Sequence, residues 1–523
     1  MGWWGVGPAE GGGTTPRNSH HLSLPKIKTM ESSATGKGLT LLIISISLAT
    51  FMAGLDGTIV NIALPTISES FHVSTSTVSW VATAYLLIMA GCVLVFGKVS
   101  DIIGFKKVFL AGFVIFTLGS LACGVLPDLF GSLTWLVGSR IFQAVGGAMI
   151  TAIAPAMITA YIPMSEKGKA MGIVMTMAAL GTALGPTIGG YLTQYFSWHA
   201  IFFINIPVGI LAVLLGAKVV PKDPIGKALT GFDTTGSALA FVGLASLLFV
   251  VSEGQTLGWT SPAILAPAAL AIITLGWFVV HELRCADPVL DLRLFKNRNF
   301  LLTNLLLSLV FFSFAGINYL LPFYLKYVRS YDTSSAGLIM TSLSFAMMGA
   351  GILSGYLFNR TGPRALCIVS GIALTAGYFL MTRLHMDTPP GYVVFSLALI
   401  GFGLGLLITP ASNMVMNSVA RTKQGMVSSL TSLERFAPLT LGIAFFNLVF
   451  IQGVIAIAAS QDVTRASPAE MQMHVLAAGF DFAFLFSFLL GLVIIVIAII
   501  AREEIHPDYA NGSGPCEPGG GMI

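Results

Sequence analysis

Long apolar runs, separated by short polar segments, occupy most of the chain between residues 39 and 501. A helix needs about 20 mostly apolar residues to cross the hydrocarbon core of a bilayer. Because lipid offers no partners to backbone N–H and C=O groups, each run is predicted to be a helix. The fourteen predicted spans are residues 39–64, 78–97, 108–126, 134–160, 168–191, 200–219, 234–252, 262–283, 300–326, 335–358, 364–382, 391–416, 426–458 and 477–501. The pattern therefore predicts an all-α membrane protein.

Positive charges fall mainly on one side of these spans. If the N-terminus is inside, 21 of the 27 Lys and Arg residues lie in inner segments, four in outer segments and two within spans. A bias of about five to one marks the cytoplasmic side of a membrane protein. We therefore expect a multi-pass protein of the inner or plasma membrane with both termini in the cytoplasm, which requires an even number of spans.

The composition agrees with a membrane protein and excludes several other classes. Hydrophobic residues make up 55% of the chain and charged residues only 10%, whereas soluble domains carry about 25% charged residues. No basic cluster points to nucleic acid, and neither the five cysteines nor the histidines have metal-ligand spacing. No GxxxxGK[ST] loop is present, so the sequence offers no ATP-binding P-loop. We expect no enzyme activity, no catalytic residues, no metal and no other cofactor.

The chain also repeats itself weakly. Three short segments recur between 252 and 262 residues further along. The pairs are GKVSDIIGFK (97–106) with GYLFNRTGPR (355–364), AGLD (53–56) with AGIN (315–318), and Gly185-Pro186 with Ala437-Pro438. Such repeats are typical of secondary transporters, whose binding site lies between the two copies. Spans 1–6 and 9–14 are therefore predicted to be two six-helix bundles, with spans 7 and 8 as an inserted pair.

These observations predict five regions along the chain. They are a disordered cytoplasmic tail (1–38), an N-terminal bundle (39–220), the inserted pair with its linkers (221–299), a C-terminal bundle (300–502) and a second cytoplasmic tail (503–523). The first 33 residues lack the apolar stretch of a signal peptide. Either Met1 or Met30 is the start of the protein.

Five motifs resemble those of the major facilitator superfamily, in its fourteen-span drug:proton antiporter branch. They are LDGTIVNIALP (55–65), GKVSDIIGFK (97–106), RIFQAVGG (140–147), GTALGPTIGG (181–190) and WHAIFFINIP (198–207). They stand in the expected order on the expected spans, and the resemblance covers roughly residues 38–502. It implies a transporter whose two bundles rock about a central cavity. Ile102 and Phe105 depart from the basic residues usual in the loop motif, and Asn359 replaces the acid in its second copy.

Charged residues inside the predicted spans are the strongest candidates for function. Asp56 lies in span 1 and Arg140 in span 4. A charge at the centre of a bilayer costs about 2.5–3.5 kcal/mol on the scale derived from insertion experiments, so a retained charge indicates a role. We expect Asp56 to exchange protons and Arg140 to act as its positive partner. The alternatives are a structural ion pair and an arginine that reaches the membrane surface.

Glu434 and Arg435 in span 13 form a second candidate set for proton coupling. Adjacent residues of a helix point to different faces, so we expect that they do not pair with each other. Glu434 is either a second proton site or an anchor for a cationic substrate. The alternative is that both residues lie near the cytoplasmic start of the helix.

Polar side chains in otherwise apolar spans predict the substrate cavity. The candidates are Asn61, Gln143, Asn318, Tyr319 and Tyr324. Abundant Met and Phe favour an adaptable apolar cavity, although the same residues commonly face lipid.

Two motifs are predicted to control the change of conformation. The loop after span 2 contributes Gly97, Asp101, Gly104, Lys106 and Lys107. By resemblance it is a latch, with Asp101 paired to the lysines, and ordinary cytoplasmic positive charge is the alternative. Span 5 contributes the small-residue stripe Gly181, Gly185, Pro186, Gly189 and Gly190. Such a stripe lets helices pack closely, and the proline permits a bend.

Together these features predict a secondary active transporter that exports amphipathic or cationic drug-like compounds in exchange for protons. The proton gradient drives it, and the bilayer, protons and small substrates are its expected partners. Two alternatives remain open. One is an importer, or a lipid or metabolite transporter, on the same fold. The other is a membrane receptor that does not transport.

Overall fold

The computed structural model describes residues 36–162, 164–221, 233–285, 288, 290–385, 387–419, 424–460 and 468–504. All regular structure in these residues is helical, as the hydrophobic pattern predicts. The two predicted tails lie almost wholly outside the described residues, as do both candidate start sites.

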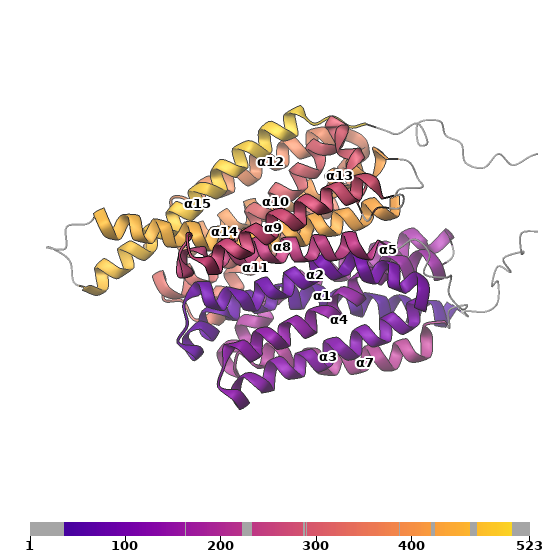
Figure 1. Cartoon of the computed structure of the whole chain (residues 1–523), viewed down its shortest axis with the longest axis horizontal. Helices are drawn as coiled ribbons and strands as arrows, with labels where there is room; N and C mark the ends of the chain where they lie inside the picture. The colour runs from indigo at the N-terminus through magenta and orange to yellow at the C-terminus, as the bar shows by residue number, and fades with distance from the viewer. Residues whose placement is uncertain are drawn as a thin grey trace, which may run out of the picture.

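The N-terminal bundle contains seven helices that supply the first six predicted spans. They are α1 (Gly36–Phe71), α2 (Thr75–Ile103), α3 (Phe105–Phe130), α4 (Leu133–Tyr161), α5 (Met164–Tyr195), α6 (Ala200–Phe203) and α7 (Asn205–Val219). Helices α6 and α7 form one span, Ala200–Val219. In Figure 1 this bundle runs from indigo through purple to the pink of α7 and occupies the lower half of the molecule.

The C-terminal bundle supplies the last six predicted spans. Its helices are α10 (Arg298–Phe323), η2 (Tyr324–Val328), α11 (Thr333–Thr361), α12 (Pro363–Met381), α13 (Pro390–Asn417), α14 (Gln424–Ser460) and α15 (Pro468–Ile500). Helix α1 begins and α15 ends toward the same end of the molecule, as an even number of spans requires (Figure 1).

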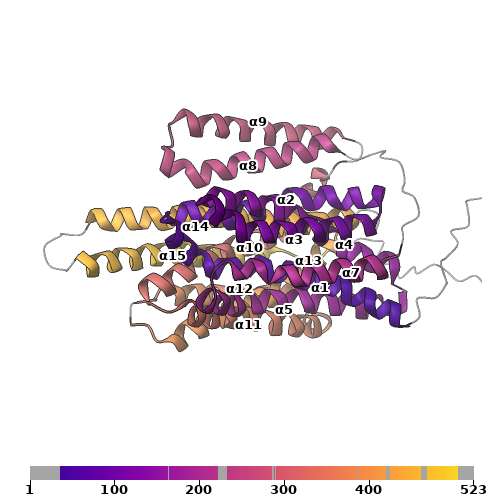
Figure 2. The same ribbon diagram turned by 90° about the horizontal axis from the view of Figure 1, so that it is seen from below.

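The inserted pair consists of α8 (Thr234–Leu257) and α9 (Pro262–Arg284), followed by the short helix η1 (Leu292–Lys296). Figure 2 shows the pair side by side, outside both bundles. Helix α8 packs against α2 of the N-terminal bundle and α14 of the C-terminal bundle. Helix α9 carries exposed apolar side chains such as Ile272 and Trp277, which suits a surface that faces lipid.

Thirteen helices in the described part of the chain are long and apolar enough to cross a membrane. Helix α5, the fifth predicted span, is not among them. Its 32 residues correspond to about 48 Å of helix, and it packs along α1. Its length and position fit a span.

The weak sequence repeat corresponds to a repeated turn. Gly104 separates α2 from α3 with φ 96°, and Gly362 separates α11 from α12 with φ 75°. In each case the glycine N–H bonds a carbonyl four residues back, Ser100 O at 3.0 Å and Phe358 O at 3.1 Å. Positive φ explains why glycine stands at both positions. The predicted second copy of the loop thus has the geometry of the first.

Hydrogen bonds join the two bundles at the end where α1 stops and α2 starts, called here the outer end. The pairs are Tyr319 with Thr75, Asn447 with Ser76, Lys326 with Thr66 and Glu69, Tyr327 with Pro65, and Thr333 with Gln194. Each pair joins a residue of the N-terminal bundle to one of the C-terminal bundle. The outer ends of the bundles are therefore held together in this structure.

Candidate ion-pair site in the N-terminal bundle

A buried ion pair lies in the middle of the N-terminal bundle. Arg140 Nη1 on α4 donates to Asp56 Oδ2 on α1 at 2.8 Å, and the side chains are 2% and 0% exposed. Arg140 is seven residues into α4 from its outer end, which is about 11 Å along the helix axis. The two charges that the sequence singled out in spans 1 and 4 therefore contact each other away from the helix ends.

Two side-chain amides complete the hydrogen bonding of the Asp56 carboxylate. Gln143 Nε2 and Asn205 Nδ2 each donate to Asp56 Oδ1 at 3.1 Å. Gln143 also accepts from Arg140 Nη1 at 2.6 Å and donates to Ser120 Oγ at 2.7 Å. Four different spans thus supply one polar network, in which both carboxylate oxygens have donors.

Aromatic rings surround the guanidinium group of Arg140. Its Cζ lies 3.9 Å from the ring centre of Tyr85 and 5.7 Å from that of Phe202. Its Nε donates to the carbonyl of Val81 at 3.3 Å. Rings at these distances attract a cation through their negative faces. The positive charge therefore contacts one carboxylate, the amide oxygen of Gln143, one backbone carbonyl and two aromatic rings.

Glycines allow the helices to approach closely enough to build this network. A Cβ at Gly119 of α3 would lie 2.6 Å from Gln143 Cα, closer than real Cβ atoms come. On the other side of α1, a Cβ at Gly185 of α5 would lie 3.0 Å from Thr58 Cβ. Thr58 Oγ1 also donates to Thr182 O at 3.1 Å. Helix α5 thus packs behind α1 while Asp56 points toward α4 and α7.

The predicted stripe of span 5 divides between two neighbours. Gly181, Gly185 and Gly189 face α1, where an added Cβ would meet backbone or side-chain atoms of that helix. Gly190 instead faces α11 of the C-terminal bundle, and a Cβ there would lie 3.3 Å from Gly337 Cα. The carbonyl of Pro186 also lies against Gly337. The stripe packs within one bundle and against the other.

Glu434 and Arg435 point to different sides of α14, as helix geometry predicts. Glu434 is buried, at 6% exposed, and its Oε2 has no hydrogen-bond partner among the described residues. Arg435 is exposed, with its guanidinium carbon 5.6 Å from the ring centre of Phe436. Glu434 is therefore a buried carboxylate that the described structure leaves partly unsatisfied.

The structure does not gather the five predicted cavity residues around one cavity. Only Asn318 lines the small cavity between the bundles, which Thr58, Pro186 and Met347 also line. Gln143 belongs to the ion-pair network. The remaining three have other surroundings: Asn61 is buried on α1, Tyr319 OH donates to Thr75 O at 2.5 Å, and Tyr324 OH donates to His385 O at 3.0 Å.

The structure describes the surroundings of most, but not all, of the predicted loop residues after α2. Gly104 forms the turn, and Gly97 has open space around its Cα. Lys106 Nζ donates to the carbonyls of Ala217 and Val220 at 2.7 Å, which places a cation at the end of α7. Lys107 is exposed, and the side chain of Asp101 lies outside the described residues. The structure therefore adds helix capping to the expected role of Lys106.

Two members of the ion-pair network were not identified from the sequence. Ser120 and Asn205 lie in apolar runs on α3 and α7, and both are buried. Asn205 could have been identified from the sequence, because an amide inside a predicted span needs a hydrogen-bond partner. Ser120 could not, since serine in a membrane helix commonly bonds its own backbone.

Comparison with known proteins places these features in a family. Residues 46–442 match the family model described as Major Facilitator Superfamily. The riboflavin transporter RibZ of Clostridioides difficile (strain 630) is 34% identical over 416 residues, covering 79% of this chain and 89% of RibZ. The multidrug resistance protein Stp of Mycobacterium tuberculosis is 33% identical over 438 residues, covering 84% of this chain and 80% of Stp. The puromycin resistance protein pur8 of Streptomyces alboniger is 30% identical over 473 residues, covering 89% and 92%.

Solved structures share the fold. A D-xylose-proton symporter superposes with a TM-score of 0.62 at 14% identity, covering 89% of this chain and 98% of the symporter. A bacterial homologue of the human lysosomal transporter Spinster, inward-facing and unoccupied, has a TM-score of 0.60 at 15% identity, covering 90% and 98%. Identities this low establish the all-helical membrane fold and nothing further.

Proposed function

The chain belongs to the major facilitator superfamily, and we propose that it exports amphipathic or cationic compounds in exchange for protons. Family and fold are those of multi-pass membrane transporters of small molecules, which are not enzymes. The exchange with protons, the class of compound and the location in the cell membrane with cytoplasmic termini are parts of this proposal.

The observation that carries the proposal is the buried pair of Asp56 and Arg140. Arginine stays charged at physiological pH, so the pair needs Asp56 in its ionised form. Protonation of Asp56 would leave the positive charge of Arg140 buried without a counter-ion. An uncompensated buried charge costs about 3–5 kcal/mol. The free-energy cost of protonating this one carboxyl is therefore large enough to favour a different arrangement of the bundle.

Coupling follows if the proton and the substrate favour different conformations. In this structure the outer ends are tied together and Asp56 is paired. We infer that protonation from the outside weakens the pair and accompanies the step that releases substrate. Loss of the proton to the cytoplasm then restores the pair and the arrangement seen here.

The choice of drug-like compounds rests on relatives and on one feature of the C-terminal bundle. Several relatives that match most of this chain are named as drug resistance proteins or as a multidrug transporter. Glu434 is a buried carboxylate with an oxygen that lacks a donor among the described residues. Such a group suits either a second proton or the positive end of a cationic substrate.

A second candidate function is transport of a vitamin-like metabolite. It is favoured by the relative named as a riboflavin transporter, which is 34% identical over most of this chain. The fold and the ion pair of this chain do not distinguish the two substrate classes, so the substrate must be decided by assay.

The deciding experiment measures ethidium retention in an efflux-deficient bacterial host. Cells carry empty vector, the wild-type chain, Asp56→Asn or Asp128→Asn at matched expression. Asp128 is the control because its side chain is 67% exposed and lies outside the network. Lower retention with wild type and Asp128→Asn, reversed by an uncoupler and absent with Asp56→Asn, supports proton-driven export.

A parallel arm uses a riboflavin auxotroph that lacks its own uptake system. Growth on low riboflavin with the wild-type chain, together with unchanged ethidium retention, would favour the metabolite transporter. Failure of both arms would move the search to a narrow substrate or to a receptor.

A further inference from the structure

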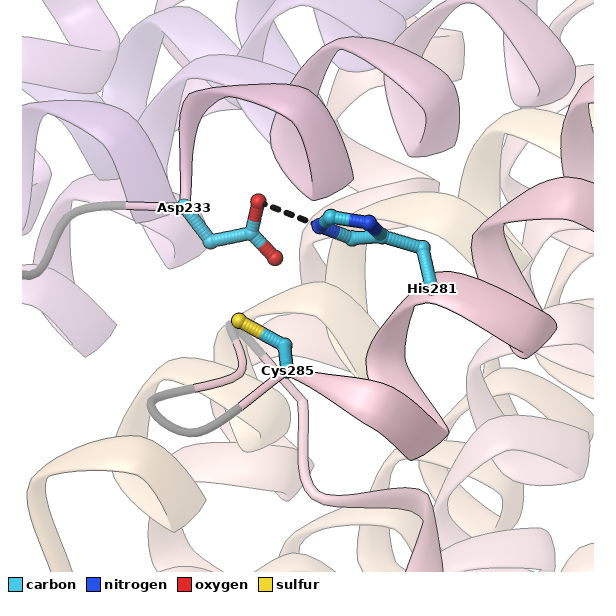
Figure 3. A group of neighbouring side chains, drawn as sticks. All are labelled: Asp233, His281 and Cys285. Carbon is cyan, nitrogen blue, oxygen red and sulfur yellow. Dashed lines mark hydrogen bonds and ion pairs between the residues drawn. The ribbon is translucent and has the colours of Figure 1, made fainter.

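A cluster of three potential metal ligands lies at the base of the inserted helix pair. Asp233 caps the start of α8, His281 lies in the last turn of α9, and Cys285 follows the end of α9. Figure 3 shows the Asp233 carboxylate with the imidazole of His281 to its right and the thiol of Cys285 below it. The cluster is remote from the ion pair of Asp56 and Arg140 in sequence and belongs to different helices.

The ligand atoms are close enough to share one ion. Asp233 Oδ1 lies 2.8 Å from His281 Nε2, and one ligand atom from each of the three residues lies within 4.8 Å of the others. Ligand atoms around a tetrahedral Zn²⁺ ion are about 3.5 Å apart, given bonds of roughly 2.0–2.3 Å. Around an ion, Asp233 and His281 would therefore move apart by about 0.5 Å, and the most widely spaced ligand atoms would approach by about 1 Å. Small changes of side-chain torsion supply both movements.

One oxygen of the buried Asp233 carboxylate lacks a hydrogen-bond donor among the described residues. Its side chain is only 4% exposed. Oδ1 interacts with Gly236 N at 2.7 Å and with His281, whereas Oδ2 has no hydrogen-bond partner among the described residues. A buried carboxylate oxygen without a donor is costly, and a bound cation removes that cost.

A second carboxylate adds negative charge to the same place. Glu282 is 2% exposed, and its Oε1 lies, like Asp233 Oδ2, against the Cα of Gly236. Its Oε2 accepts a hydrogen bond from Leu290 N at 3.1 Å. A second buried carboxylate thus lies close to that of Asp233.

We propose that Asp233, His281 and Cys285 bind a divalent transition-metal ion of the zinc type, which joins the start of α8 to the end of α9. One nitrogen, one sulfur and one oxygen donor are typical of Zn²⁺ and its neighbours in the first transition row. Mg²⁺ and Ca²⁺ prefer oxygen donors, so the thiol argues against them. A water molecule completes a four-coordinate site.

The test is metal binding by the purified full-length chain in detergent. Co²⁺ is the probe, because a cobalt–thiolate bond gives a charge-transfer absorption band in the near ultraviolet. The variants are Cys285→Ser, which removes the thiolate, and Asp233→Asn, which keeps a good helix cap but removes the charge. Cys92→Ser is the matched control, since Cys92 is a free, partly buried cysteine on α2.

The proposal expects one equivalent of Co²⁺ with a thiolate band in wild type and in Cys92→Ser, displaced by Zn²⁺. The band is lost in Cys285→Ser, and affinity falls by at least about tenfold in Asp233→Asn. The melting temperature of wild type rises with Zn²⁺, whereas that of Cys285→Ser does not.

Absence of the band in correctly folded wild type would overturn the proposal, and so would a band that persists in Cys285→Ser. In either case Asp233 and His281 form an ordinary ion pair that caps α8. Because the readout is metal binding, its failure leaves the proposed transport function unaffected.

Discussion

Arg140 of α4 donates a hydrogen bond to Asp56 of α1 at 2.8 Å, in a position where neither side chain is more than 2% exposed. The two residues are 84 positions apart in sequence, and the segment between them includes two complete spans. The network around them draws on α3 and α7 as well. Any change in the charge of Asp56 therefore acts on the packing of the whole N-terminal bundle.

The first prediction concerns the two charges together. Arg140→Gln leaves Asp56 buried without its cation and should destabilise the protein by about 3–5 kcal/mol. The double variant Asp56→Asn with Arg140→Gln should regain most of that stability, because no charge is left unpaired. It should still fail to export ethidium. Melting temperature in detergent and dye retention in cells measure the two effects separately, and export by the double variant would exclude Asp56 as the proton site.

A second prediction tests the amide of Asn205. Asn205→Ala removes one of two hydrogen bonds to Asp56 Oδ1, and a hydrogen bond to a charged group contributes about 1.5–3 kcal/mol. We expect efflux to slow at least several-fold and its pH dependence to shift. Asn304→Ala is the control, since Asn304 lies in the other bundle, is similarly buried, and donates within the described structure to Phe300 O of its own helix. Equal loss of transport in both variants would mean that Asn205 contributes to transport only through packing.

A third prediction concerns the contact between α5 and α1. Gly185→Ala places a Cβ 3.0 Å from Thr58 Cβ and 3.1 Å from Ile59 N, so the helices must separate. Overpacking of this kind costs about 1–3 kcal/mol, and the melting temperature should fall. Gly349→Ala on α11 is the matched change, because nothing lies within 4 Å of its added Cβ. That variant should be neutral or slightly more stable, as alanine favours helix.

A fourth prediction addresses the tie between the outer ends. Lys326 Nζ lies 2.5 Å from Glu69 Oε2, and both side chains are partly exposed, so the pair contributes no more than about 1 kcal/mol. Lys326→Gln should therefore open the outer side only a few-fold more often. The measurement is labelling of Asn318→Cys by an impermeant maleimide, in a background without native cysteines. Unchanged labelling would mean that this ion pair does not hold the outer side closed.

The charge-swapped pair Glu69→Lys with Lys326→Glu provides the control for that experiment. It should restore the slow labelling of the wild type, because the ion pair is rebuilt with opposite polarity. Arg329→Gln should have no effect, since Arg329 interacts with Tyr331 of its own bundle.

Several features of the fold were predictable from the sequence because they depend on local hydropathy. The predicted span at 134–160 corresponds to α4, Leu133–Tyr161, and that at 391–416 corresponds to α13, Pro390–Asn417. The shared loop motif pointed to the matched turns at Gly104 and Gly362, since only glycine adopts positive φ without strain. The cost of burying charge in lipid singled out Asp56 and Arg140 before their contact was seen.

The cavity residues could not be assigned in the same way. Asn318 and Tyr319 are neighbours in sequence, yet one lines the small cavity between the bundles and the other bonds Thr75. Adjacent side chains of a helix are separated by about 100° around its axis. The rotation of the helix about that axis therefore decides which of the two residues faces the cavity. Tyr324 lies more than a turn further on and bonds His385 instead.

The sequence by itself determined the helices, their repeat and the charged residues that a membrane would not retain without a role. These follow from the transfer of single side chains and backbone groups into lipid, which depends on local composition. Only the tertiary structure decided which distant residues meet. Asn205 and Ser120 complete the network of Asp56, and Asp233 joins His281 across 48 residues. Such contacts depend on how helices pack, and packing is a property of several helices at once.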